Sequence, residues 1–271
     1  MKTMRFSFLL AILIVSAWSS VPAKADDVHI AVATNFRTTL TKLAGVFEAQ
    51  TGHKAIISSG ATGALHAQIL NGAPYDVFLA ADMERPTDLA SRGLGVNESV
   101  RVYAHGRLVL WADGEIEDVR ARLGTPQPGD HIAIANPAIA PYGRAARQAM
   151  NAMGLEGHWA ERTVMGQNVG QAFAFVQTGN AVMAFVAHAQ ILEHVDSHET
   201  SFSENAIVVP GEFYEPLMQG ALLLKRSASN PAANSFYQFL YTDKAQNVIA
   251  NSGYSPAEPG ARAGNGAKGG Q

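Results

Sequence analysis

The 271-residue sequence contains no cysteine. Disulfide bonds, thiol nucleophiles and thiolate-bound zinc are therefore excluded, and the fold depends on its own apolar core. Basic residues are also scarce, because 20 lysines and arginines are outnumbered by 23 aspartates and glutamates. A net charge of −3 gives no general positive field for nucleic acid or anionic lipid. Any anion that binds must be held by local geometry rather than by bulk charge.

Long apolar runs are the third absence. The run near the start, Phe6 to Val15, is well short of the ~20 residues that span a bilayer, and no later run reaches that length. Lys2 and Arg5 precede this run and Ala23-Lys24-Ala25 follows it, which is the pattern of an export signal. We therefore expect residues 1–25 to be a signal peptide cleaved after Ala25, and the mature protein to be soluble in the periplasm.

What the sequence does have is a regular alternation of strand-like and helix-like segments. Residues 28–33, 54–58 and 76–80 are short apolar runs typical of strands, and the segments between them space their apolar residues as helices do. Further strands are expected at 107–111, 131–135, 182–186 and 222–225 and around Val164, and further helices at 143–153, 171–177 and 232–241. Such alternation implies right-handed parallel crossovers. The sequence predicts a doubly wound α/β protein with two lobes.

The lobe boundaries follow from two expected crossings of the chain, near His105-Gly106 and near Pro210-Gly211. The first lobe then takes residues 26–105 and 211–254, and the second takes 106–210. Residues 255–271 are mainly glycine, alanine and proline and predict a disordered tail. Within it, Gly264 to Gly269 has the spacing of a dinucleotide fingerprint but lacks the flanking strand and helix that such a site needs.

Polar turns follow four of the expected strands. In open α/β sheets, ligands bind beyond the carboxyl ends of the strands, where helix N-termini present free N–H groups. The carboxyl ends of the first two strands are followed by Thr34-Asn35 and by Ser58 to Thr62. Two later strands are followed in the same way by Asn136 to Gly143 and by Gly166 to Gly170. Asn35 and Thr62 are also good caps for the helices that follow, which would explain either turn alone. Together the turns favour a cradle for an anion.

Five segments resemble the periplasmic molybdate-binding proteins of ABC transporters: Ala33–Phe36, Ser58–Gly63, Asn71–Phe78, Asn136–Gly143 and Asn168–Ala172. Their order and spacing agree with that family up to about Tyr254. The resemblance implies a type II periplasmic binding protein fold, in which two α/β lobes close on one tetrahedral oxyanion in the cleft between them. It also implies delivery of molybdate, or tungstate, to a membrane permease, with no enzyme activity and no cofactor. We expect a monomer.

The resemblance also assigns the ligand positions. They fall on Thr34, Asn35, Thr62, and the backbone N–H groups of Tyr142 and Val169, with no direct bond from the protein to molybdenum. Many family members have serine where Asn35 and Thr62 stand, and tyrosine where Ala187 stands. The sequence resembles the subgroup with Thr-Asn at the first turn and without that tyrosine, which leaves one donor of the pocket unassigned.

The chemistry of the donors fits such a ligand. A dianion with four oxygens needs several converging donors, and neutral N–H and O–H groups can supply charge-assisted bonds of about 1.5–3 kcal/mol each. Arg37, Arg144 and Arg147 lie near the turns in sequence and offer direct ion pairs instead. An arginine on the solvated face of a first helical turn is nevertheless ordinary.

Two other functions remain as alternatives, a binding protein for sulfate or phosphate and an exported hydrolase. A hydrolase would have carboxylates available at Asp76 and Asp82, but Asp82 is also placed to cap the next helix. The histidines His188, His194 and His198 lack the spacing of a His-Glu-x-x-His zinc helix. The sequence therefore favours a binding protein over an enzyme.

Overall fold

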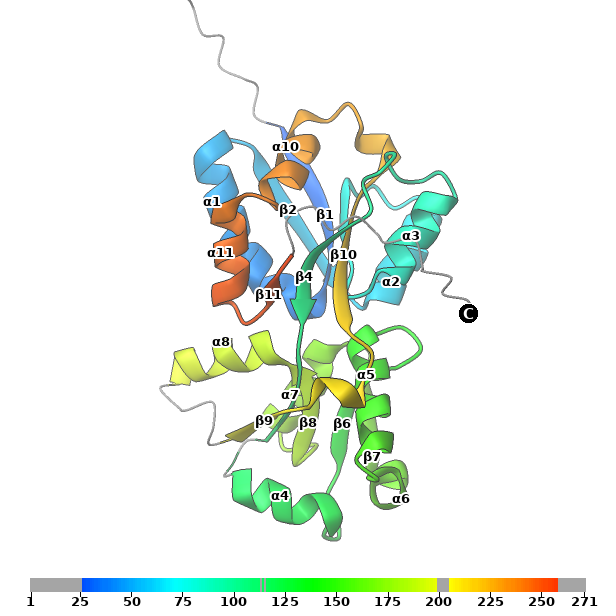
Figure 1. The fold of residues 1–271 in the computed structure, drawn as a ribbon, viewed down its shortest axis with the longest axis vertical. Coiled ribbons are helices and arrows are strands. Elements are labelled where there is room, and N and C mark those ends of the chain that lie inside the picture. Colours follow the sequence, from blue (N-terminus) through cyan, green and yellow to red (C-terminus); the bar gives the residue numbers. More distant parts are fainter. Residues whose placement is uncertain (1–25, 113, 115, 199–204, 258–271) are drawn as a thin grey trace, which may run out of the picture.

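A computed structural model describes residues 26–112, 114, 116–198 and 205–257. The predicted signal peptide and residues 258–271 of the predicted tail lie outside this part of the chain. Figure 1 shows two α/β lobes, one above the other along the longest axis, joined by strands that run between them. Each lobe contains one sheet with its own helices, as the alternation of strands and helices predicts.

The sheet of the first lobe has six strands in the order β11-β4-β10-β3-β1-β2. Their bounds are Asp27–Ala33 for β1, Lys54–Gly60 for β2, Val77–Leu79 for β3, Arg101–Gly106 for β4, Leu217–Leu223 for β10 and Ser255–Pro256 for β11. β1 is parallel to β2 and β3, and β10 runs antiparallel between β3 and β4. Because Ala33 pairs with Gly60, the turns after β1 and β2 are neighbours at one edge of the sheet.

Helices cover both faces of this sheet because alternate residues of β1 point to opposite sides. Val28, Ile30 and Val32 pack with α1, α10 and α11, whereas Ala31 packs with α2 and α3. Figure 1 shows α1 and α11 on one side of the sheet and α2 and α3 on the other. The helices are α1 (Arg37–Thr51), α2 (Thr62–Leu70), α3 (Glu84–Ser91), α10 (Pro231–Phe239) and α11 (Asp243–Asn251), with short 3₁₀ turns η1 (Thr34–Phe36) and η4 (Lys225–Ser227).

The sheet of the second lobe has five strands in the order β7-β6-β8-β5-β9. They are β5 (Leu108–Trp111), β6 (Ile132–Ala135), β7 (Thr163–Gly166), β8 (Met183–Ala187) and β9 (Ala206–Val208). The helices are α4 (Ile116–Gly124), α5 (Pro141–Ala152), α6 (Glu156–Trp159), α7 (Val169–Gln177) and α8 (His188–His198), with 3₁₀ turns η2 (Ala160–Arg162) and η3 (Gly211–Phe213). β6 is parallel to β7, so the turns after them also meet at one edge.

Two adjacent strands carry the chain between the lobes. β4 ends at Gly106 and β5 begins at Leu108, and the chain returns between Val208 of β9 and Leu217 of β10. Leu217 pairs with Gly106, so the two crossings lie side by side (Figure 1). β10 also contains an irregularity in its register, between its third and fourth residues. Any rotation of one lobe against the other must be absorbed at this pair of strands.

Three expectations about the elements need correction. The last long strand is β10, which begins at Leu217 rather than at residue 222 and ends before Lys225, which begins η4. Ser255 and Pro256 pair with β4 as β11, so the predicted tail begins too early. Proline is tolerated there because β11 is the edge strand of the sheet. Strands β4 and β9 and helices α3, α4, α6 and α11 were not anticipated. Across the described residues, no helix combines the length and apolar character needed to cross a bilayer.

Candidate functional site

A small cavity lies where the polar turns of both lobes meet. Its volume is about 10 Å³, similar to the ~10–15 Å³ that a single water molecule needs. It is lined by Ala33, Thr34, Asn35, Gly60, Ala61, Thr62, Ala81, Ala140, Pro141, Tyr142, Asn168 and Val169. The structure therefore brings all the predicted ligand positions to one cavity. The lobes touch beside it, where the N–H of Gly63 donates to the carbonyl oxygen of Ile139 at 2.8 Å.

The cavity is surrounded by helix N-termini, three of which have no side-chain cap. Ala33, Ala61 and Ala140 are the N-cap residues of η1, α2 and α5, and alanine offers no hydrogen-bonding side chain. The first N–H groups of a helix have no partner within the helix. Tyr142 is the second residue of α5, after Pro141, and Val169 is the first residue of α7. Uncapped helix N-termini converging from two lobes form a binding site suited to an anion.

Two threonine hydroxyl groups add donors to this set. Thr62 is 1% exposed, and its Oγ1 accepts a hydrogen bond from the N–H of Ala81 at 3.1 Å. The hydroxyl hydrogen of Thr62 is therefore left to donate elsewhere. Oγ1 of Thr34 is buried and has no hydrogen-bond partner within the described part of the chain. Buried polar atoms are nearly always paired in folded proteins, so this orphaned hydroxyl points to a missing partner such as a ligand.

Asn35 has a different role from the helix cap that its position in the sequence also suggested. Its Nδ2 donates to Oε1 of Gln219 at 2.8 Å and to the hydroxyl of Tyr254 at 3.1 Å. Tyr254 in turn donates its hydroxyl hydrogen to the carbonyl oxygen of Asn35 at 2.7 Å. Both amide hydrogens of Asn35 are thus used inside the first lobe. The side chain fastens the first turn to β10, and the backbone N–H of Asn35 is the donor that remains for the cavity.

Thr62 does not cap a helix either. The N-cap of α2 is Ala61, and the Thr62 hydroxyl binds the loop after β3 instead. The cap at α7 is the one exception among these N-termini, because the side chain of Asn168 accepts a hydrogen bond from the N–H of Gln171 at 3.1 Å. That bond uses the third N–H of α7 and leaves the N–H of Val169 outside the cap.

The phenol oxygen of Tyr142 is buried and has no hydrogen-bond partner within the described part of the chain. Its oxygen lies so close to Gly106 that any Cβ at that position would collide with it. Burial raises the pKa of this phenol well above its ordinary value, and the nearby phenols of Tyr254 and Tyr103 add to the shift. Tyr142 is therefore neutral at physiological pH and brings no negative charge to the neighbourhood of the cavity.

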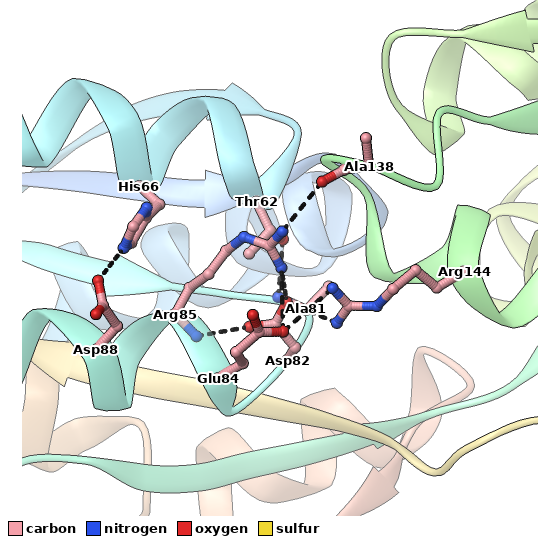
Figure 2. Close-up of polar contacts among 9 residues, drawn as sticks. All are labelled: Thr62, His66, Ala81, Asp82, Glu84, Arg85, Asp88, Ala138 and Arg144. Carbon is pink, nitrogen blue, oxygen red and sulfur yellow. Dashed lines mark hydrogen bonds and ion pairs between the residues drawn. The ribbon is translucent and has the colours of Figure 1, made fainter.

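The arginines considered from the sequence do not line the cavity. Nη2 of Arg144 is 3.4 Å from Oδ2 of Asp82, and its Nη1 is 3.2 Å from Oε2 of Glu84 (Figure 2). Arg37 lines a separate, larger cleft of about 350 Å³ that shares Thr34 and Asn35 with the small cavity. Arg147 is exposed on α5. The residues at the cavity itself therefore offer neutral donors only.

The groups that a hydrolase would need are engaged elsewhere. Asp76 accepts hydrogen bonds from the N–H of His29 at 2.7 Å and from the hydroxyl of Ser227, so it joins three segments of the first lobe. His188 contacts the carbonyl of Gly253, and His194 packs edge-on against Trp111. Wherever side chains are described, no three His, Cys, Asp or Glu residues are grouped as a metal site would require. The side chain of His198 lies outside the described set.

Sequence reasoning missed the residues that support the site. Gln219 is fully buried and Tyr254 is 4% exposed, and both hold the Asn35 turn from the far end of the chain. The available signal was a lone glutamine in the apolar run Leu217 to Leu223. A buried glutamine in a strand needs partners, and here one of them is Asn35.

Fold and site together define a class of protein. Two α/β lobes, connected by adjacent crossing strands and meeting at a small cavity of helix N-termini, are the architecture of a type II periplasmic binding protein. Such proteins bind a solute between their lobes and close around it.

Comparison with known proteins supports this assignment to a class. The family model for bacterial extracellular solute-binding proteins matches residues 28–255. The chain is 41% identical over 253 residues to the molybdate-binding protein ModA of Azotobacter vinelandii, covering 92% of this chain and 98% of that protein. It is 36% identical over 237 residues to ModA of Rhodobacter capsulatus, covering 87% and 90%. The solved A. vinelandii periplasmic molybdate-binding protein matches with a TM-score of 0.77 at 37% identity, covering 85% of this chain and 100% of that one.

The chain therefore belongs to the family of bacterial extracellular solute-binding proteins and is of the ModA type. Members of this family bind and present solutes rather than convert them.

Proposed function

We propose that this protein captures molybdate in the periplasm and delivers it to the membrane permease of an ABC transporter. The observation that carries the proposal is the set of neutral donors around one cavity, drawn from both lobes: the hydroxyls of Thr34 and Thr62 and the backbone N–H groups of Asn35, Tyr142 and Val169. The relatives named for molybdate binding, at 41% and 36% identity, support the choice of ion.

The geometry suggests how binding and closure are coupled. Thr34, Asn35 and Thr62 belong to the first lobe, and Tyr142 and Val169 belong to the second. An ion bonded by both sets stabilises the closed state, because neither set alone satisfies its four oxygens. Each hydrogen bond to the dianion contributes about 1.5–3 kcal/mol. Fixed donors also measure the spacing of the oxygens, which lets a site distinguish oxyanions of different size, and the relatives named for molybdate binding support molybdate as the ion.

Finer features complete the proposal. Export uses residues 1–25 as a signal peptide cleaved after Ala25, and the mature protein acts as a monomer. The predicted lobes comprise residues 26–105 with 211–254, and residues 106–210. Phe213 and Tyr214 pack against the core of the second lobe, which supports a return crossing a few residues later than 211.

Thermal unfolding tests the proposal. A ligand present at about a hundred times its Kd adds about 2.7 kcal/mol to the stability of the folded state. For a chain of this size, that gain raises the Tm by about 5–10 °C. We expect this rise with molybdate and tungstate and not with equal concentrations of sulfate or phosphate. A Tm that molybdate leaves unchanged would contradict the proposal.

A further inference from the structure

A group of charged side chains bridges the two lobes beside the cavity. Glu84 and Arg85 begin α3 in the first lobe, Asp82 lies two residues before that helix, and Arg144 lies on α5 in the second lobe (Figure 2). Nη2 of Arg144 is 3.4 Å from Oδ2 of Asp82, and Nη1 is 3.2 Å from Oε2 of Glu84. We call these four residues the inter-lobe clasp.

In the clasp, an arginine of each lobe contacts the opposite lobe. Arg85 pairs with Asp82 in its own lobe and also donates from Nη2 to the carbonyl oxygen of Ala138 in the other lobe, at 3.4 Å. Figure 2 shows Arg85 and Arg144 reaching across the boundary in opposite directions. Two carboxylates balance two guanidinium groups, so the clasp adds no net charge beside the cavity.

Burial sets the contact of Arg144 with Asp82 apart from ordinary surface ion pairs, whereas the contact with Glu84 lies at the surface. The side chains of Asp82 and Arg85 are 10% and 11% exposed, and that of Arg144 is 35% exposed. Pairs at the surface contribute little because solvent and salt screen them. A pair with one partner almost buried is less screened, and loss of either partner leaves the other charge without compensation.

The clasp is connected to the ligand donors on both sides without lining the cavity itself. Asp82 directly follows Ala81, whose N–H binds the hydroxyl of Thr62. Arg144 is two residues after Tyr142 on the same helix. A backbone hydrogen bond from Gly63 to the carbonyl of Ile139, at 2.8 Å, crosses between the lobes on the same side. Separation of the lobes breaks the contacts that cross between them: those of Arg144 with Asp82 and Glu84, that of Arg85 with Ala138, and the bond from Gly63 to Ile139.

We propose that the inter-lobe clasp forms on closure and sets how long the bound tetrahedral oxyanion is retained. This inference rests on the proposed function and adds to it a residue, Arg144, that controls release without touching the ion. Because Glu84 is 68% exposed and Arg144 is 35% exposed, salt screens this pair of the clasp and speeds release.

The test is the rate at which radiolabelled molybdate leaves the mature protein during a chase with unlabelled molybdate. We expect Arg144→Gln to raise this rate roughly tenfold in about 20 mM NaCl. The difference from the unaltered protein shrinks in about 500 mM NaCl, because salt has by then screened the clasp. Arg147→Gln is the matched control: it removes the same charge from an exposed position one turn along α5, and release stays unchanged.

A double-mutant cycle separates the clasp from simple loss of folding. Glu84 is 68% exposed, so Glu84→Gln leaves the fold intact. If Glu84 and Arg144 act as a pair, the double variant releases molybdate more slowly than the product of the two single effects predicts. If Arg144→Gln releases molybdate at the same rate as the unaltered protein at both salt concentrations, the proposed role of the clasp in retention is wrong. That result would not contradict the proposed function. Failure of the unaltered protein to retain any molybdate would overturn both.

Discussion

At the scale of single residues, the site is notable for donors without a cationic partner. The hydroxyls of Thr34 and Thr62 and the backbone N–H groups at the cavity are all neutral, and Arg144 is occupied by Asp82 and Glu84. Neutral donors fixed by helices and strands recognise the shape of an oxyanion, because each has a set position. Some side chains therefore face the cavity, and others, such as that of Asn35, hold the residues that face the cavity in place.

Thr34 offers the cleanest test of a residue that faces the cavity. Its Oγ1 has no protein partner in the described part of the chain, so Thr34→Val removes no internal hydrogen bond. We expect the free energy of unfolding without ligand to be unchanged or slightly higher, and molybdate binding to weaken by about 1–3 kcal/mol. Denaturant titration and calorimetry measure the two quantities. Thr41→Val, at an exposed position on α1, is the control and should affect neither by more than about 0.5 kcal/mol. Unchanged affinity in Thr34→Val would remove Thr34 from the site.

Tyr254 tests a residue that holds the site without lining it. Tyr254→Phe removes the hydroxyl that accepts from Nδ2 of Asn35 and donates to its carbonyl. We expect a loss of about 1–3 kcal/mol in stability, because buried groups of Asn35 lose their partner. Molybdate binding should weaken as well, since the first turn is then less firmly held. Tyr75→Phe is the control, because its hydroxyl binds Gln68 at an exposed position. Full affinity in Tyr254→Phe would show that the turn keeps its shape without this bond.

At the scale of helices and strands, the sequence predicted the elements that carry the site better than those that support it. β1, β2 and β6 were recognisable because each is a short apolar run followed by a polar turn. The start of β10 was missed because Gln219 and Gly220 interrupt its apolar pattern. Nor could the sequence decide whether Asn35 caps a helix, because its partner Gln219 is 184 positions away. Local patterns predict turns, whereas the partners of a turn depend on the complete fold.

The close approach of α7 to the first turn gives a testable prediction at this scale. A Cβ at Gly170 would lie 2.7 Å from Cγ2 of Thr34, which belongs to the other lobe. Gly170→Ala should therefore oppose closure and weaken molybdate binding by about 1–3 kcal/mol, measured by calorimetry. Adding Thr34→Ser removes the obstructing methyl group but keeps the hydroxyl, so the double variant should recover affinity.

The control for this substitution is Gly45→Ala in α1, where a Cβ meets no atom within 4 Å. It should leave affinity unchanged and raise stability by about 0.5–1 kcal/mol, as glycine-to-alanine changes inside helices do. If Gly170→Ala binds as tightly as the unaltered protein, the lobes need not approach this closely around the ion.

At the scale of the whole molecule, two sheets with their own helices meet at the small cavity and are joined by adjacent strands. The sequence predicted the α/β class and two lobes, because alternating strands and helices leave few other arrangements. It could not predict how closely the lobes meet, since that depends on contacts such as Arg144 with Asp82 across them. Closure and the choice of ion are therefore properties of the assembled molecule.

Titration calorimetry of the mature protein with four ions tests the proposed function most directly. We expect molybdate and tungstate to bind with one ion per chain, because the cavity has a single set of converging donors. Sulfate and phosphate should give no heat beyond dilution. Heat from sulfate or phosphate with none from molybdate would contradict the proposal that this protein captures molybdate.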